Sequence, residues 1–380
     1  MDWRVPLADV RLGEEEEKAV LEVLRSGWLT MGAVTQAFEQ ELAAFVGAKH
    51  AFAVNNATAA LHLACLAAGL HEGDEAIVPS LTFVASANAI RYTGAKVVFA
   101  DIESEDWLCV SPRSIEEKIT ERTKAIMVMH YAGFACDMSA ILRIAEKYHL
   151  AVIEDAAHAI GASLDGKALG TWGDMGCYSF FGNKNLTTGE GGMLVTNNDL
   201  LADKVRILRS HGMTTLTWDR HQGHASSYDV VDLGYNYRID EIRSAIGSEQ
   251  LKKLPAGNAR RDELVQRYRQ ALSEQCPAIG LPFGEKRGIS SQHIFPILLP
   301  EGIEKEAFRE QLKQRGIQTS FHYPPAHHFR IYRQEGETLL MTERVARRQV
   351  TLPLFPDMSD QQQEWVIEGV VEALARLLGD

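Results

Sequence analysis

Short apolar runs that alternate with helical stretches are the feature that most constrains this 380-residue chain. Continuous runs of Ala, Val, Ile and Met are typical of parallel strands that are buried on both faces. The helical stretches between them can supply the crossovers that parallel strands need. We therefore predict an α/β fold with a large, mostly parallel sheet. The predicted strands are residues 51–54, 76–79, 96–99, 125–129, 151–153, 177–180 and 192–195.

The pattern changes after about residue 254. Pro255 is expected to end a helix over 239–254, and a second helix is expected over 259–273. We predict two domains, 1–254 and a smaller C-terminal α+β domain over 255–380, and a long loop over 211–232. The other predicted elements are a strand at 293–299 and helices at 13–26, 35–46, 59–70, 82–93, 112–119, 138–148, 199–209, 305–315 and 361–378.

Charge and cysteine usage exclude several classes of protein. With 39 Lys and Arg against 51 Asp and Glu, the net charge is −12, which disfavours binding to nucleic-acid polymers or anionic membranes. No apolar run reaches about 18 residues, so no membrane span is expected. The N-terminus lacks a signal-peptide pattern, and the five cysteines have no metal-ligand spacing. We predict a cytoplasmic protein without a metal site or a disulfide framework.

Lys184 carries the densest chemical signal. It lies in a turn between two predicted strands, among glycines and hydroxyl side chains, in the segment Ser179-Phe-Phe-Gly-Asn-Lys-Asn-Leu-Thr-Thr-Gly-Glu-Gly-Gly192. A lysine that is desolvated in such a turn has a lowered pKa and can act as an amine nucleophile. The alternative is an ordinary exposed lysine, which a simple hairpin would also explain.

Asp155 ends the predicted strand Ala151–Ile153 and precedes Ala156, Ala157 and His158. Open α/β sheets bind ligands at the carboxyl ends of their strands, where this acid could hold a protonated ring nitrogen. An Asp in this position could equally cap a helix. His158, taken alone, fits a satisfied buried histidine as well as it fits a catalyst.

A third signal lies at residues 55–58, where Asn-Asn-Ala-Thr follows a strand and opens a helix. The first N–H groups of a helix have no partner inside it and lie at the positive end of the helix dipole, so together they make an anion site. A plain helix cap without a ligand is the commoner reading, and His62 one turn later is expected to pack.

These three signals together point to pyridoxal 5′-phosphate (PLP). A phosphate cradle, an acid at a strand end and an amine 29 residues later (184 − 155) are the groups that this cofactor needs. The lysine would bind the cofactor covalently, and the acid would keep its ring nitrogen protonated.

The lysine segment resembles the signature of the DegT/DnrJ/EryC1/StrS family of PLP-dependent sugar aminotransferases. The resemblance runs nearly from end to end. It includes Gly27-Trp-Leu-Thr-Met-Gly32, Pro79-Ser-Leu-Thr-Phe-Val-Ala-Ser-Ala-Asn88, His130-Tyr-Ala-Gly133, Glu154-Asp-Ala-Ala-His158, Gly234-Tyr-Asn-Tyr-Arg238 and Leu352-Pro-Leu-Phe-Pro356.

The resemblance implies fold type I, the aspartate-aminotransferase-like architecture, and a homodimer with shared active sites. It implies that Lys184 is the lysine that binds PLP and that Asp155 pairs with the ring nitrogen. His158 would lie near the phenolic oxygen, and Phe83 would stack on the ring. The phosphate would be held by Ala57, Thr58 and Ser179, with Asn236 reaching in from the partner subunit. The segment Asn56-Ala57-Thr58 departs from the family's usual Ser-Gly-Thr. Phe181 departs from its usual His, and no role is assigned to Phe181.

The resemblance also implies the reaction. An amino-acid donor, expected to be L-glutamate, gives its amino group to the enzyme. A nucleotide-linked keto-deoxysugar then takes it up, in a ping-pong cycle through pyridoxamine phosphate. In this cycle Lys184 would act as general base and acid. The candidate substrate-lining residues are Trp28, Thr30, Met31, Arg220, His322 and Tyr323.

Two alternatives stay open. Sugar dehydratases on the same fold resemble this family but carry His in place of the lysine. A regulatory protein could bind the cofactor without turnover. Lys184 counts against the first alternative, and its pairing with Asp155 counts against the second. A plain nucleotide-binding module is disfavoured because neither a GxGxxG motif nor a Walker loop is present.

Overall fold

The central element is a seven-stranded, mostly parallel sheet, which confirms the predicted fold class. A computed structural model describes residues 3–215, 227–333, 336 and 338–379. The strand order is β1-β9-β8-β5-β4-β2-β3, and only β9 runs antiparallel to its neighbours. The strands are β1 (His50–Val54), β2 (Glu75–Pro79), β3 (Lys96–Ala100), β4 (Thr123–Met129), β5 (Ala151–Asp155), β8 (Met175–Ser179) and β9 (Gly192–Thr196).

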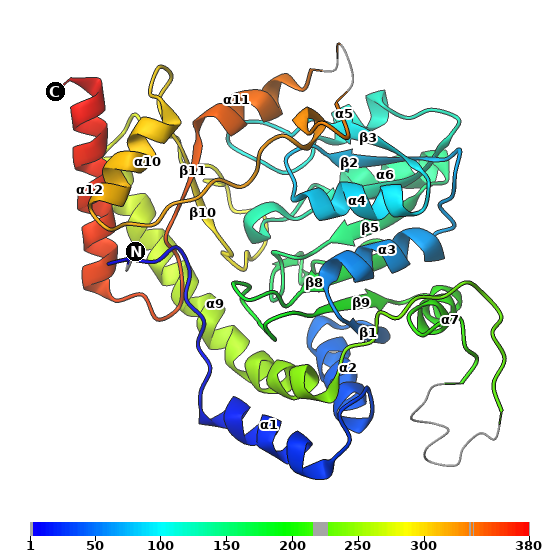
Figure 1. Cartoon of the computed structure of the whole chain (residues 1–380). Coiled ribbons are helices and arrows are strands. Elements are labelled where there is room, and N and C mark those ends of the chain that lie inside the picture. The colour runs from blue at the N-terminus through cyan, green and yellow to red at the C-terminus, as the bar shows by residue number, and fades with distance from the viewer. Residues whose placement is uncertain (1–2, 216–226, 334–335, 337, 380) are drawn as a thin grey trace.

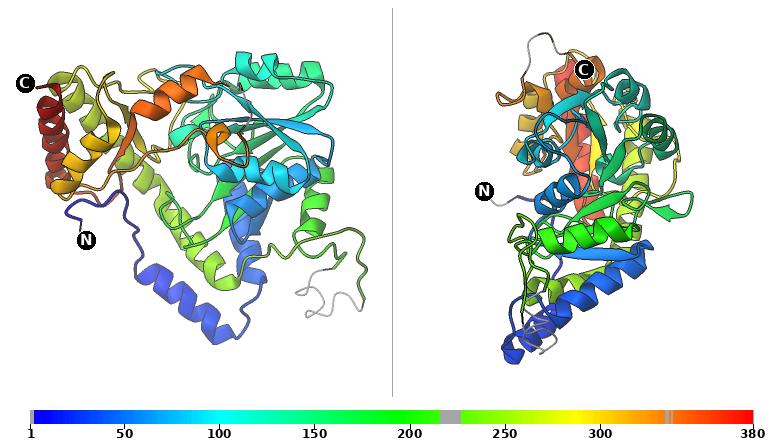
Figure 2. Two further views of the ribbon diagram at one scale, coloured as in Figure 1. Left: turned by 45° about the horizontal axis from the view of Figure 1, so that its top comes forward. Right: turned by 90° about the vertical axis from the view of Figure 1, so that its right-hand side faces the viewer.

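Helices cover both faces of this sheet (Figures 1 and 2). One apolar core lies between the sheet and α3, α4 and α7, and a second core lies on the other face against α6. The helices of this part are α1 (Glu14–Ser26), α2 (Ala33–Val46), α3 (Ala57–Ala67), α4 (Val84–Tyr92), α5 (Pro112–Glu117), α6 (Met138–Tyr148) and α7 (Asp199–Leu208). A short hairpin joins β6 (Ser163–Leu164) to β7 (Lys167–Ala168), and η1 (Tyr131–Gly133) is a single 3₁₀ turn.

One long helix replaces the two predicted after residue 238, so the prediction that Pro255 ends a helix is wrong. Helix α9 runs without interruption from Glu241 to Gln275. Pro255 removes one backbone donor, but both halves of the helix are held by packing. Leu254 is buried against α2 and the sheet, and Leu264 is buried in the C-terminal core. The predicted domain boundary at 254/255 falls inside α9, and the division into two domains stays a prediction.

The C-terminal elements surround a separate apolar core. Strand β10 (Phe295–Leu298) pairs antiparallel with β11 (Gln349–Leu352), and α10 (Lys305–Gln314) packs on α12 (Asp360–Leu378). Neither β11 nor helix α11 (Leu340–Arg348) was predicted. The N-terminal segment returns to this core, where Val5 pairs with Ile317. Figure 1 shows both chain termini beside α12.

Several chain segments meet at one edge of the sheet. The carboxyl ends of β5 and β8 lie there, and so does the start of β9, because Ser179 pairs with Gly192. Val54, at the end of β1, also pairs with Gly192. Among the described residues, no helix is long and apolar enough to cross a membrane, and all five cysteines are free and buried.

Candidate active site

A cavity of about 1010 Å³ opens at this edge of the sheet. Its volume is at the upper end of the range for small-molecule sites. Its lining brings together nine of the residues predicted from the sequence: Ala57, Thr58, Phe83, Asp155, His158, Ser179, Lys184, His322 and Tyr323.

Lys184 lies in the connection between β8 and β9, as predicted. Its backbone N–H donates to the Phe181 carbonyl, which closes a tight turn. The side chain is half-buried and reaches into the cavity rather than into solvent. Burial lowers the pKa of the Lys184 amine to about 8, although the nearby charge of Asp155 works in the opposite direction. Roughly a tenth of this amine is therefore neutral and nucleophilic at pH 7.

Asp155 is the last residue of β5 and is buried. Its carboxylate accepts hydrogen bonds from the Ser86 hydroxyl at 2.6 Å and from the Ala157 N–H at 3.1 Å. No helix follows it, so the alternative of a helix cap is wrong. Burial raises the pKa of Asp155 above its ordinary value, and its hydrogen bonds and the charge of Lys184 oppose this shift. A cation in the cavity would relieve the cost of burying this charge.

The N-terminus of α3 forms one wall of the cavity. Asn56 caps this helix by accepting from the Ala59 N–H at 2.8 Å, which leaves the N–H groups of Ala57 and Thr58 without a partner inside the helix. A Cβ on Gly192 would lie 2.6 Å from the Ala57 nitrogen. Because position 192 is glycine, β9 can approach the helix end and leave the cradle open.

His158 is held in one orientation and one tautomer. Its Nδ1 accepts from the Ala132 N–H at 3.3 Å, and its Nε2 lies 2.9 Å from the Tyr323 hydroxyl. Burial, reinforced by the charge of Lys184, keeps the pKa of His158 well below its ordinary value. The ring is therefore neutral and its proton is on Nε2. Because Nε2 donates to Tyr323, the proton of the Tyr323 hydroxyl is available to a ligand.

These residues fit PLP. The helix end can take a phosphate, Asp155 can take a protonated ring nitrogen, and Lys184 can take an aldehyde. Phe83 is 53% exposed although it lies in the cavity wall, and an aromatic face left open beside a cavity is suited to stacking on a planar ring.

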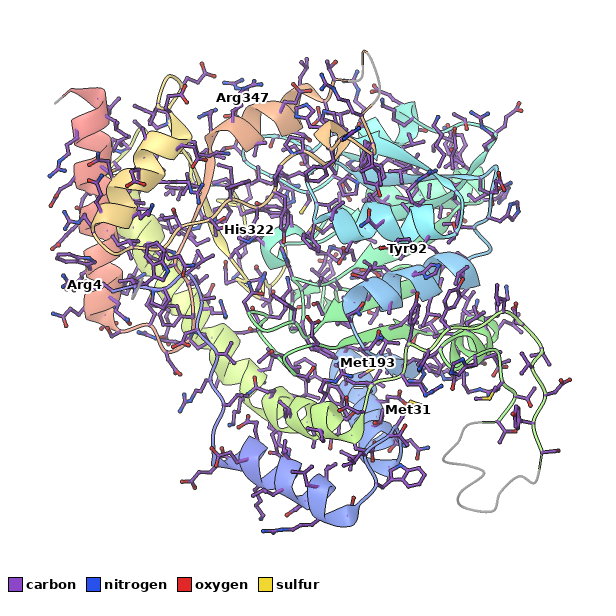
Figure 3. The ribbon with its side chains drawn as sticks, viewed as in Figure 1. Arg4, Met31, Tyr92, Met193, His322 and Arg347 are labelled. Atoms are coloured by element: carbon purple, nitrogen blue, oxygen red, sulfur yellow. The ribbon has the colours of Figure 1, made fainter. Side chains whose placement is uncertain are left out.

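Four of the predicted residues that the structure describes do not line this cavity. Thr30 pairs with Asp240, Met31 is buried and Asn236 pairs with Ser210. Figure 3 shows Met31 well away from His322, which is beside the cavity. Trp28 is also absent from the lining, and Arg220 lies outside the described residues. Their proposed roles stay predictions.

Two buried residues of the site were given no role from the sequence. Ser86 lies on α4 and donates to Asp155. His293 lies just before β10, with its Nε2 at 3.3 Å from Lys184 Nζ. The available signal was a single histidine at the head of the apolar run Ile294–Leu299.

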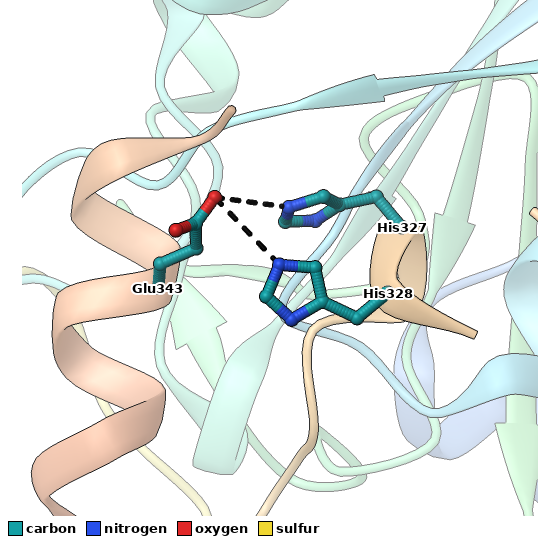
Figure 4. A group of neighbouring side chains, drawn as sticks. All are labelled: His327, His328 and Glu343. Atoms are coloured by element: carbon teal, nitrogen blue, oxygen red, sulfur yellow. Dashed lines mark hydrogen bonds and ion pairs between the residues drawn. The ribbon is translucent and has the colours of Figure 1, made fainter. Parts of the chain in front are cut away.

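A second cluster holds the segment that follows Tyr323. The Glu343 carboxylate lies 3.3 Å from His327 and 3.7 Å from His328, both of which belong to the 3₁₀ turn η2 (Ala326–His328) (Figure 4). Their ligand atoms lie within 4.8 Å of one another, so this group could hold a metal ion. The same carboxylate accepts from the Leu339 N–H, and His327 Nδ1 lies 2.6 Å from the Ser80 hydroxyl. These hydrogen bonds already hold η2 against α11 and against Ser80, the residue that follows β2.

Comparisons with known proteins give one consistent result. The sequence profile of the DegT/DnrJ/EryC1/StrS aminotransferase family matches residues 10–371. The chain is 41% identical over 368 residues to the spore coat polysaccharide biosynthesis protein SpsC of Bacillus subtilis, covering 94% of each chain.

Solved structures agree with this result. Helicobacter pylori PseC, described as an aminotransferase involved in the biosynthesis of pseudoaminic acid, matches with a TM-score of 0.91 and 30% identity over 98% of this chain and 99% of that one. The PLP form of Spr1654 from Streptococcus pneumoniae matches with a TM-score of 0.90 and 27% identity over 98% and 99%.

Proposed function

Because the chain belongs to the DegT/DnrJ/EryC1/StrS aminotransferase family, we propose that it moves an amino group from L-glutamate to the keto group of a nucleotide-activated deoxysugar. PLP-dependent amino transfer to sugars is the activity of this family. The donor, the nucleotide carrier and the ping-pong order are the parts that we propose for this chain.

One observation carries the proposal. The Lys184 amine, the Asp155 carboxylate and the open N–H groups at the start of α3 line a single cavity. No one of these features is specific alone. Together they provide a separate contact for the aldehyde, the ring nitrogen and the phosphate of one cofactor.

The residues of the chain have distinct tasks in this reaction. When bound, PLP supplies a carbonyl carbon that accepts the amino group and a ring that withdraws electrons. Lys184 Nζ, neutral in part because of its burial, takes a proton from the substrate carbon that carries the nitrogen and later returns one. Asp155 holds the proton on the ring nitrogen, and Ser86 fixes the orientation of Asp155. Tyr323 offers its hydroxyl proton to the substrate side of the cavity.

We also propose that the enzyme is a homodimer and that Asn236 of each chain contributes to the site of its partner. Asn236 does not line the cavity of its own chain. The neighbouring apolar side chains of Val230, Val231 and Leu233 are more than half exposed, with Leu233 at 82%. Exposed apolar side chains grouped in this way are typical of a protein interface.

The sugar dehydratase and the regulatory protein remain the competing functions. Purified protein would be loaded with PLP, treated with L-glutamate, freed of small molecules and then given a panel of nucleotide keto-sugars. Transamination predicts that 2-oxoglutarate forms first and that an amino sugar forms only after the second addition. Loss of water from the sugar without gain of nitrogen would support the dehydratase. Binding of PLP without formation of 2-oxoglutarate would support the regulatory protein.

A further inference from the structure

A buried histidine, His293, lies within hydrogen-bond distance of the Lys184 amine. His293 Nε2 lies 3.3 Å from Lys184 Nζ, and His293 Nδ1 lies 2.9 Å from the side-chain oxygen of Asn185. Two consecutive residues thus contact the two nitrogens of one imidazole. We propose that His293 is a positioning residue that accepts a hydrogen bond from the Lys184 amine, orients this amine and sets its affinity for a proton.

The direction of this hydrogen bond follows from a chain of neighbouring contacts. Asn258 donates its amide N–H to the Ile160 carbonyl, so its oxygen faces Asn185. Asn185 donates to that oxygen at 2.8 Å and to the Ser291 carbonyl at 2.7 Å, so its own oxygen faces His293. That oxygen can only accept. His293 therefore carries its proton on Nδ1, and its Nε2 presents a lone pair to Lys184.

The backbone holds this arrangement in place. The His293 N–H donates to the Ala132 carbonyl, and the His293 carbonyl accepts from Arg261. Gly161 leaves room for the chain of amides, because a Cβ there would lie 2.5 Å from the Asn258 nitrogen. His293 is only 5% exposed, although it also lines the cavity.

The charged and titratable groups around His293 keep it neutral. Burial lowers the pKa of His293 well below its ordinary value, and Lys184, His158, Arg261 and His322 shift it in the same direction. Asp155 is the acid that faces Lys184 across the cavity. His293 therefore accepts a hydrogen bond from Lys184 and is not itself protonated to the imidazolium form.

This contact has two consequences for the amine. A neutral amine that directs one N–H at His293 keeps its lone pair turned to the cavity. An acceptor also favours the protonated form of its partner, so His293 holds the pKa of Lys184 above the value that burial alone would give. The lysine can then retain the proton that it takes from the substrate.

The inference rests on the proposed function for its purpose, but its test does not require turnover. The apoprotein would be labelled with a limiting amount of an amine-reactive reagent across pH 6 to 11, and labelling at Lys184 would be read by peptide mass spectrometry. Lys252, an exposed lysine on α9, is the internal reference. His71→Phe, a change at an exposed histidine outside the cavity, is the matched control.

We expect the labelling midpoint of Lys184 to fall by about half to one pKa unit in His293→Phe. From a pKa of about 8, this change raises the neutral fraction at pH 7, and with it the labelling relative to Lys252, about 3- to 5-fold. In His293→Gln, whose side-chain oxygen can accept the same hydrogen bond, we expect labelling within about twofold of wild type. An unchanged midpoint in a folded His293→Phe protein would overturn the proposal.

A measurement on the wild-type apoprotein covers the case in which His293→Phe does not fold. Nitrogen NMR of ring-labelled histidine, with His293 assigned through His293→Gln, reports which ring nitrogen carries the proton. The Nδ1–H form between pH 6 and 9 supports the proposal, and the Nε2–H form or a charged ring contradicts it. Neither readout depends on PLP uptake, so a failure of the proposed function and a failure of this inference give different results.

Discussion

Two adjacent acids on β5 face opposite sides of the sheet and are used differently. Glu154 accepts from His130 at 2.8 Å, from the Gly170 N–H at 2.7 Å and from the Gly173 N–H at 2.6 Å. The Asp155 carboxylate lines the cavity, and among the described residues only Ser86 and Ala157 donate to it. Both are buried.

The hydrogen-bond partners of the two acids separate a structural acid from a functional one. Successive side chains of a strand point to opposite faces, so the two acids have separate surroundings. Glu154 uses its oxygens on groups of its own chain that fix the loop after β7. Asp155 keeps a face turned to a cavity that also holds Lys184. Burial alone would not have distinguished the two; their partners do.

Among changes to residues that line the cavity, Lys184→Ala should cause the largest loss of activity. Removing the group that moves the proton is expected to lower kcat/KM for amino transfer by at least roughly 10²- to 10⁴-fold. Lys252→Ala, on the exposed face of α9, is the control and should be active. Steady-state kinetics with L-glutamate and an accepted keto-sugar would check this. Activity of Lys184→Ala within tenfold of wild type would show that the cavity face of the sheet does not carry the chemistry that we assign to it.

Glu154→Gln should mainly affect stability. The new amide places a donor among the donors of His130, Gly170 and Gly173, so about 2 to 4 kcal/mol of unfolding free energy is expected to be lost. PLP uptake by the remaining folded protein should be unaltered. Urea unfolding and a PLP titration would measure the two quantities. A variant of wild-type stability that fails to bind PLP would reverse the roles of the two acids.

Asp155→Asn should show the opposite pattern. Losing a charged hydrogen bond to the cofactor is expected to lower kcat/KM by roughly 10- to 150-fold. The folded-state pKa of Asp155 is raised, so its charge costs stability above the unfolded pKa. The neutral amide should leave apoprotein stability unchanged or slightly higher at pH 7. Denaturant unfolding of the apoprotein that reveals a marked loss of stability would contradict this assignment.

The smallest expected effect is a change of apoprotein stability with pH that is caused by the lowered pKa of Lys184. Its folded-state pKa of about 8 lies below its ordinary value of 10.5, so the unfolded chain binds the proton more tightly. The cost to folding is full below about pH 8 and disappears as the pH rises toward 10.5. Compared with Lys184→Met, the wild-type apoprotein should gain about 1 to 3 kcal/mol between pH 7 and 10.5, allowing for partial exposure. Parallel stability curves for the two proteins would show that Lys184 is not desolvated.

Much of the sheet and of the cavity floor could be predicted from the sequence. The strand ends carry their signals locally: β5 ends at Asp155, and the turn of Lys184 lies between two apolar runs. A parallel sheet brings such ends to one edge. Residues at these ends could therefore be assigned to one site without knowledge of any long-range contact.

The parts that could not be predicted depend on long-range packing. His293 meets Lys184 across 109 residues, and no local pattern reports such a contact. The continuity of α9 through Pro255 was missed because the helix is held by two separate cores, which local propensity does not reflect. Helix α11 and strand β11 are short and depend on packing against the C-terminal core.

The most direct test of the account is to locate PLP on the chain. The protein would be incubated with PLP, reduced with borohydride, digested and mapped by mass spectrometry, with Asp155→Asn and Glu154→Gln treated in the same way. We expect a pyridoxyl group on Lys184 alone, in wild type and in Glu154→Gln. Attachment to another lysine, or no attachment in the folded wild-type protein, would contradict it.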